Sequence, residues 1–300
     1  LVQPKSLSEP YARLLEKDAS IVRWRLFATS SQESTVGFVK KSVADIYNPA
    51  SQKNSLGLSS AIEFEGSTIS YGNLNPTQTS PEDMLSLARS TSVDSTEPLV
   101  LPPAAEGSQF PQLVSDSGYD PDMLSKLLPQ ATELRELLIS HGVSALEGAL
   151  DANYSEDTYS DSNGLSLREI AASYGAICEI EGRLYTVQNS RVYPEPFEIV
   201  RSRIPELCQL AKALDADKVQ PAEARLPIFT PGGMAFLNTY LLSHLSGTSV
   251  VSGSSRFTLD DFKSGLQVAH KSLSLSFDQT RDMERSSFAF TPEGITGQKF

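Results

Sequence analysis

The order of strand-like and helix-like segments constrains this fold more than any single motif does. Over residues 21–27, Val22, Trp24 and Leu26 alternate with a second set of side chains, which is the period of a strand with one well-buried face. Strand patterns follow at 35–43, 56–64 and 68–71, and Glu65-Gly66 is typical of a hairpin turn. Runs of strands followed by helices favour an α+β fold with mainly antiparallel sheet.

Helices are predicted at 10–18, 79–92, 120–140 and 196–214, and Thr79-Ser80-Pro81 with two acidic residues after it is typical of a hydroxyl-capped start for the second. In the third of these, Pro129 predicts a kink or a break into two helices. Residues 143–187 again favour strands, which we place at 145–150, 154–160, 166–180 and 183–187.

Two segments without periodicity have the composition of linkers. Residues 93–118 are rich in Pro, Ser and acidic side chains, and 215–225 have a similar character. We place the domain boundary in the second. The expected domains are an N-terminal α+β domain at 1–221 and the start of a β-rich second domain at 222–300.

Composition narrows the class of protein. The formal net charge of -12 argues against a nucleic-acid surface, which needs clustered Lys and Arg. No apolar run approaches the ~20 residues of a membrane span, and the first residues lack a signal pattern. Cys178 and Cys208 fit two buried thiols better than a disulfide. We expect a cytoplasmic protein without a membrane anchor.

A strand, a turn and a helix follow one another near the end of the chain. Residues 226–229 are apolar, Pro231-Gly232-Gly233 follows, and an apolar helix is expected to stop at Gly247. A serine-rich turn at 252–257, a strand-like run at 273–278 and the sequence Phe290-Thr291-Pro292-Glu293-Gly294 come after it. In order and spacing these segments resemble the C-terminal domain of the TldD/PmbA family, once named modulators of DNA gyrase. Ser162-Asn163-Gly164-Leu165 is similar to that family's Asn-Ser-x-Gly turn.

The resemblance implies a metallopeptidase-like fold without the metal motif. Catalytic members carry His-Glu-x-x-x-His on this helix, and zinc needs such converging ligands with a Glu as general base. Aligning the helix ends places Thr239, Tyr240 and His244 at the three motif positions. Threonine and tyrosine replace neither an imidazole ligand nor a carboxylate base. We therefore expect no catalytic residue and no metal in this chain, with zinc supplied, if at all, by a partner subunit.

The resemblance also implies partners. The metal-free PmbA or TldE type pairs with a TldD-type catalytic subunit and encloses a cavity that receives unfolded peptide. Family members run on past the Pro-x-Glu-Gly segment with further strands, whereas this sequence ends at Phe300. The expected role is a non-catalytic subunit or scaffold that binds extended peptide beside a TldD-like subunit or a second copy of itself. The alternatives are a peptidase with a metal shared across an interface and an unrelated α+β interaction protein.

Other candidate chemistry has a structural interpretation that we prefer. Asp260-Asp261 after Thr258 is typical of a capping box, and Glu156-Asp157 of a solvated turn. The oxygen-rich run of Asp157, Ser160, Asp161 and Asn163 lacks the spacing of a calcium loop. A serine nucleophile at Ser243 or Ser246 has no nucleophile-elbow motif around it. His141 and His270 are expected at a helix end and in a polar turn, and the aromatic side chains of the strands are expected in the core; these are Trp24, Phe27, Phe38 and Phe64.

Overall fold

The structure is a computed structural model of the chain, and it describes residues 4–42, 46–103, 120–182, 184–216, 239–267, 278–281 and 287–297. The chain divides into two compact units. The first comprises Leu1–Ala213 with Phe277–Phe300, and the second comprises Leu214–Ser276. The expected domains at 1–221 and 222–300 remain a prediction, because compactness alone does not test which segment folds independently.

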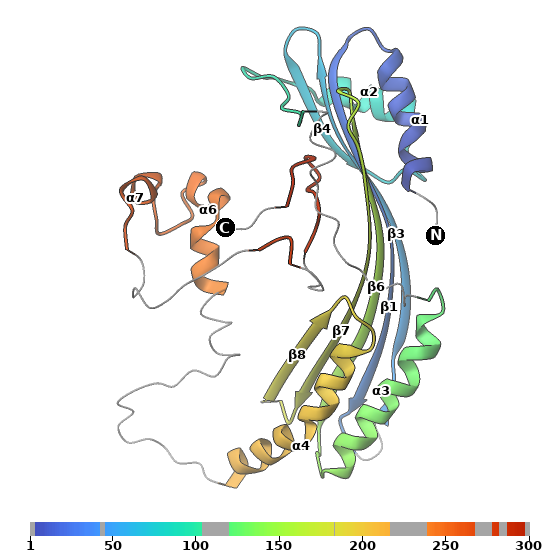
Figure 1. Ribbon diagram of the computed structural model, residues 1–300, viewed down its shortest axis with the longest axis vertical. Coiled ribbons are helices and arrows are strands. Elements are labelled where there is room, and N and C mark those ends of the chain that lie inside the picture. The colour runs from blue at the N-terminus through green and yellow to red at the C-terminus, as the bar shows by residue number, and fades with distance from the viewer. Residues whose placement is uncertain are drawn as a thin grey trace. The chain divides into compact units, whose positions relative to one another are not determined.

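One antiparallel sheet of eight strands forms the body of the first unit (Figure 1). The strand order is β5-β4-β3-β1-β6-β7-β8, and β2 pairs with β1 beside this path. The strands are β1 (Ile21–Lys40), β2 (Ile46–Tyr47), β3 (Ala50–Phe64), β4 (Thr68–Leu74), β5 (Val93–Asp94), β6 (Leu146–Asp161), β7 (Ser166–Ile180) and β8 (Leu184–Ser190). With helices packed on this sheet, the predicted α+β class is confirmed.

Two strands are longer than their sequence pattern indicates. The sequence predicts separate strands at 21–27 and 35–43, whereas β1 runs without a break from Ile21 to Lys40. Likewise β6 joins the two strands predicted at 145–150 and 154–160. The middle of β1 has small and polar side chains that carry no apolar signal. Its backbone pairs with β3 on one side and β6 on the other, and these ladders hold the strand regardless of side-chain hydropathy.

Side chains alternate between two faces of β1. Every even-numbered residue from Trp24 to Phe38 is buried, whereas most odd-numbered ones are partly exposed. Four helices cover the even-numbered face: α1 (Pro4–Lys17), α2 (Pro81–Thr91), α3 (Met123–Ser140) and α4 (Glu195–Ala216). The face of the odd-numbered residues carries no helix in the described part of the first unit.

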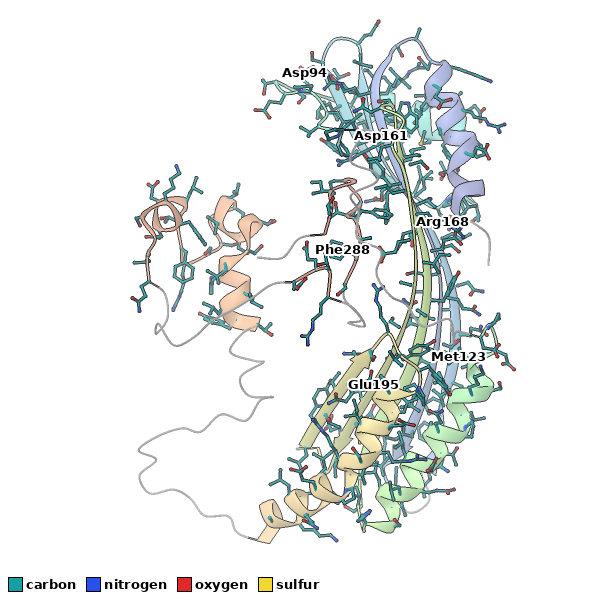
Figure 2. The ribbon with its side chains drawn as sticks, viewed as in Figure 1. Asp94, Met123, Asp161, Arg168, Glu195 and Phe288 are labelled. Carbon is teal, nitrogen blue, oxygen red and sulfur yellow. The ribbon has the colours of Figure 1, made fainter. Side chains whose placement is uncertain are left out.

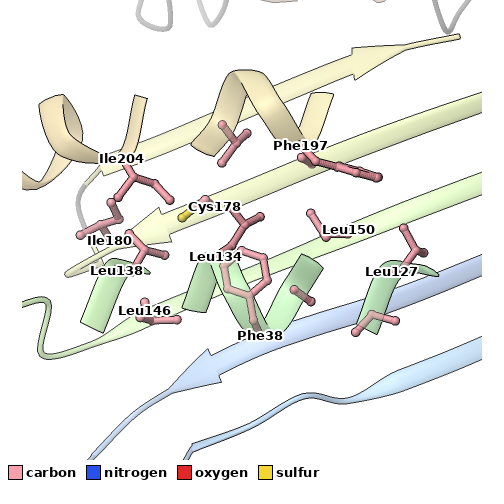
Figure 3. Close-up of a cluster of buried hydrophobic side chains, with 14 of the residues drawn as sticks. Phe38, Leu127, Leu134, Leu138, Leu146, Leu150, Cys178, Ile180, Phe197 and Ile204 are labelled. Carbon is pink, nitrogen blue, oxygen red and sulfur yellow. The ribbon is translucent and has the colours of Figure 1, made fainter. Parts of the chain in front are cut away.

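Two apolar clusters join the helices to the sheet. One gathers α1 and α2 around Trp24 and Leu26. The other gathers α3 and α4 around Phe38 and Cys178, as Figure 3 shows. Both cysteines are free and buried, as expected, and burial raises the pKa of the Cys178 thiol to about 12.

Helix ends follow the predicted chemistry more closely than helix interiors do. Ser80 caps α2 by accepting a hydrogen bond from the Asp83 amide, and His141 caps the end of α3. Of the kink or break predicted at Pro129, the break is wrong, because α3 is one helix across it. Leu127 and Ala131, on either side of the proline, are both fully buried against the sheet, so tertiary packing holds the two parts together. No described helix combines the length and apolarity needed to cross a bilayer.

The described part of the second unit is a set of short helices. A helix spans 239–245, α6 spans Gly247–Val251, and α7 spans Leu259–Ser264. The predicted stop at Gly247 is thus followed at once by another helical turn, which the Val250 amide closes on the Ser246 carbonyl at 3.0 Å. The predicted strand at 226–229, the Pro-Gly-Gly turn, the body of the strand at 273–278 and His270 lie outside the described residues.

Candidate functional site

The helix at 239–245 carries all three positions aligned with the metal motif. The rings of Tyr240 and His244 meet edge to face with centroids 4.9 Å apart. His244 Nδ1 accepts a hydrogen bond from the Arg256 backbone amide at 3.2 Å, and the His244 carbonyl accepts one from the Ser255 hydroxyl at 2.7 Å. Through this hydrogen bond the imidazole holds the turn that follows α6 against this helix.

These residues do not fit a zinc site. Zinc takes imidazole, thiolate or carboxylate ligands, and this helix offers a single imidazole whose Nδ1 already accepts an N–H. Among the described residues, no group of three or more His, Cys, Asp and Glu side chains lies in an arrangement that could hold a metal ion. Ser243, considered above as a nucleophile, donates its hydroxyl to the Tyr240 carbonyl at 2.7 Å. The absence of a catalytic residue and a metal stays a prediction.

An apolar pocket of about 220 Å³ lies within the second unit. It is lined by Leu245, Phe257, Asp261, Phe262, Gly265 and Leu266. Asp261 caps α7, where its carboxylate accepts the Thr258 amide and hydroxyl, each at 2.8 Å. Those hydrogen bonds, the backbone one first, lower the pKa of Asp261. The capping interpretation of Asp260-Asp261 is confirmed for Asp261, and its oxygens already have local partners.

The interpretation of Glu156-Asp157 as a solvated turn is wrong. Both residues lie inside β6, where successive side chains point to opposite faces. Glu156 is buried and forms an ion pair with Arg168 at 2.8 Å (Figure 2 labels Arg168 on the strand surface). Asp157 lies on the other face, directly opposite Glu169 of β7. Burial, with smaller contributions from the neighbouring carboxylates, raises the pKa of Asp157.

The oxygen-rich run after Asp157 does not converge on one point. Asp161 is buried and accepts hydrogen bonds from the Tyr159 hydroxyl at 3.0 Å and from the amides of Asn163 and Leu165 at 2.9 and 3.1 Å. Ser160 points to the opposite face of β6 from Asp157 and Asp161. The carboxylate of Asp161 thus builds the turn at 162–165 rather than facing an open cavity.

Segment 287–297 lies on the odd-numbered face of the sheet in the first unit (Figure 2 labels Phe288 on it). Glu169 accepts a hydrogen bond from the Ala289 amide at 2.9 Å. Arg191, which is 2% exposed, forms an ion pair with Glu169 at 3.6 Å and donates a hydrogen bond to the Ser287 carbonyl. A buried charge pair therefore holds the start of this segment to the sheet.

The remainder of segment 287–297 is held by aromatic contacts. Phe290 meets Phe27 edge to face with ring centroids 6.4 Å apart, in a cluster that includes Tyr159. Gly294 has φ +77° and lies against the Tyr159 ring, so that a Cβ there would stand 2.5 Å from it. The family-like sequence at 290–294 is thus packed on the first unit, although the sequence placed it in the second domain.

A pocket of about 400 Å³ lies beside this segment, between residues 100–103 and 293–296. Its lining comprises Arg25, Val100, Leu101, Pro102, Pro103, Glu293, Ile295 and Thr296. All of these belong to the first unit. Sequence reasoning missed Arg25 and residues 100–103, which it assigned to a strand face and a linker. Only the family-like motif at 290–294 pointed to this part of the chain.

Comparison of the fold with solved structures finds clear neighbours. TldE from Thermococcus kodakarensis superposes with a TM-score of 0.68 at 16% identity, covering 98% of this chain and 66% of that one. A candidate modulator of DNA gyrase from Bacteroides thetaiotaomicron superposes with a TM-score of 0.63 at 13% identity, covering 99% and 68%. The chain thus spans about two thirds of the length of these neighbours. No family model and no curated protein matches the sequence itself. The chain therefore has the fold of TldE and of gyrase-modulator proteins, as its resemblance to the TldD/PmbA family predicted.

Proposed function

We propose that this chain is a non-catalytic subunit of a TldD/PmbA-like peptidase assembly, where it helps bind extended peptide beside a metal-bearing subunit. The observation that carries the proposal is the helix at 239–245. In our alignment with the family motif Thr239 and Tyr240 stand at the positions of a ligand and a base, and the His244 imidazole holds a neighbouring turn. The fold of TldE supports the same assignment.

The sheet supports the peptide-binding part of the proposal. In the described residues, β8 pairs with β7 along one side only. Tyr185 and Val187 on β8 are 60% and 42% exposed. An extended peptide can add to such an edge through backbone hydrogen bonds, which gives an affinity that tolerates many sequences.

Co-expression with a TldD-type subunit tests the proposal. We expect the two chains to elute together with a fixed stoichiometry, and we expect metal-dependent cleavage of an unfolded peptide only when both are present. Native mass spectrometry and metal analysis of each species are the measurements. Stoichiometric zinc on this chain alone, with peptide cleavage that a chelator abolishes, would favour the alternative of an independent peptidase and contradict the proposal.

A further inference from the structure

We propose that the pocket formed by Arg25, residues 100–103 and residues 293–296 binds the C-terminal carboxylate of a peptide that ends in an apolar residue. This inference rests on the proposed peptide-binding function and specifies which part of the peptide the first unit recognises. The volume of the pocket, about 400 Å³, falls within the range of small-ligand sites.

Arg25 supplies the charge that would recognise a carboxylate. It projects from the odd-numbered face of β1, and its cross-strand neighbour on β6 is Asp161. The carboxylate of Asp161 is occupied by the Tyr159 hydroxyl and two backbone amides. Within the described part of the chain, Arg25 forms neither an ion pair nor a side-chain hydrogen bond. A partly buried arginine that lines a pocket without an ion-pair partner is suited to an incoming anion.

The first wall of the pocket is fixed before any ligand arrives. The Leu99 amide donates to Glu63 at 3.0 Å, and the Leu99 carbonyl accepts from Arg23 at 3.1 Å. Asn163 donates to the Pro102 carbonyl at 3.3 Å. Leu99 itself is buried, which anchors the start of the wall. A rigid wall lowers the entropy cost of binding.

The second wall is equally well held. A turn closes between Thr291 and Ile295, whose backbones hydrogen-bond at 2.9 Å, and the Tyr159 ring supports Gly294 from below. Val100 and Ile295, on opposite walls, are 77% and 51% exposed. An apolar side chain between them would remove apolar surface from water, which favours a terminal residue such as leucine.

Glu293 also lines the pocket, and its charge is opposite to that of Arg25. Its exposed carboxylate repels an incoming carboxylate, whereas Arg25 attracts it. Neutralising each residue in turn must therefore move the affinity in opposite directions. A pocket that merely accepted an apolar side chain would respond to neither change.

The experiment uses the full 300-residue chain and a fluorescein-labelled Gly-Ala-Ala-Leu peptide in two forms, a free acid and a C-terminal amide. Fluorescence anisotropy gives both affinities. We expect the free acid to bind about tenfold more tightly, since a charge-assisted hydrogen bond is lost in the amide. Arg25→Gln should remove that difference, and Glu293→Gln should tighten binding of the acid about threefold. Arg13→Gln, which removes a charge from an exposed position of α1, should leave both affinities unchanged.

The outcomes separate this inference from the proposed function. Equal binding of acid and amide, or an acid preference that survives Arg25→Gln, overturns the carboxylate site but leaves peptide binding in place. If neither the acid nor the amide peptide binds to the chain alone or to its complex with a TldD-type subunit, the peptide-binding function itself is contradicted. N-acetyl-leucine competes in a parallel arm, and an affinity equal to that of the peptide overturns the assignment to a peptide terminus. The acid-to-amide ratio of the unmodified protein decides the question even if a variant fails to fold.

Discussion

Segment 287–297 and the helices at 239–267 both carry sequence that resembles one family, yet the structure orders them in different ways. Within segment 287–297, Ser287, Ala289 and Phe290 are buried. Among residues 239–267 none is buried, and large apolar side chains such as Tyr240 and Phe262 are about half exposed. The first segment takes its order from the sheet beneath it, whereas the second depends on local caps and turns.

This difference predicts how much stability a substitution in each region should cost. Contacts between segment 287–297 and the sheet combine a buried charge pair with aromatic packing, and both are costly to disrupt. The caps and ring contacts at 239–267 are solvent-exposed, and such interactions contribute about 1 kcal/mol or less each. Substitutions in both regions test the comparison, from the largest expected effect to the smallest.

Arg191→Met should destabilise the first unit by about 3–5 kcal/mol, because it leaves the Glu169 carboxylate buried without its ion-pair partner. Urea unfolding measures the free energy, and limited proteolysis near residue 287 reports release of the segment. Arg201→Met is the matched control. Its ion pair with Glu133 is about half exposed, so a loss of no more than about 1 kcal/mol is expected. Equal losses in the two variants would show that the buried pair does not hold the segment.

Gly294→Ala and Gly253→Ala compare the two regions at the same backbone geometry. Their φ angles are +77° and +72°, so each alanine incurs a similar backbone cost of about 1–2 kcal/mol. Only at Gly294 would the new Cβ also meet a ring, that of Tyr159 at 2.5 Å, which adds about 1–3 kcal/mol. Thermal unfolding and amide exchange measure the difference. Indistinguishable variants would mean that the segment can move away from the sheet without cost.

Asp157→Asn tests the sheet face beneath the segment through pH. Burial raises the pKa of Asp157 above its ordinary value of 3.8, so the folded protein holds this proton more tightly than the unfolded chain does. The contribution of Asp157 to stability is therefore greatest at low pH and falls as the pH rises through the raised pKa. Asp157→Asn should flatten that fall in urea unfolding measured at intervals between pH 4 and pH 7.

Asp261 provides the contrast of opposite sign. Its pKa is lowered, so its contribution is present above its ordinary pKa and is lost as the pH falls through the lowered value. The unmodified protein should therefore lose α7 structure at acid pH, and Asp261→Asn should abolish this pH dependence. The pH dependence of stability that Asp157 causes should not change. A decline with rising pH that survives Asp157→Asn would show that the raised pKa of Asp157 is not its cause.

Thr258→Ala has the smallest expected effect. It removes half of the capping box of α7. The free energy needed to open that helix locally should therefore fall by about 1 kcal/mol. Amide exchange of Phe262 and its neighbours measures this opening. The urea midpoint of the first unit should not change, since α7 belongs to the second unit. A shift of that midpoint would show that the two units unfold together.

Local sequence signals predicted the elements whose order arises locally. The Ser80 cap, the capping box at Thr258 and the hairpin turn at Glu65-Gly66 all depend on side chains or glycines within a few residues of their partners. The helix predicted from residue 196 is α4. Trp24, Phe38 and Phe64 are buried on the strands as their alternation indicated, with Phe27 packed beside Phe290.

The failures share one cause, which is pairing between residues far apart in the chain. The polar middle of β1 is a strand because β3 and β6 flank it, and Glu156 is buried because Arg168 of β7 neutralises it. Neither partner can be read from a window of neighbouring residues. The pocket around Arg25 was missed for the same reason, because its walls come from segments nearly 200 residues apart.

By itself the sequence determined the α+β class and the helix caps, and it predicted that Thr239, Tyr240 and His244 stand where the family has its metal motif. These depend on side-chain chemistry and short-range geometry. Only the tertiary structure decided that 287–297 packs on the first unit and that Arg25 faces a pocket. Cross-strand register fixes which side chains share a face, and register is set by the whole sheet rather than by any one strand.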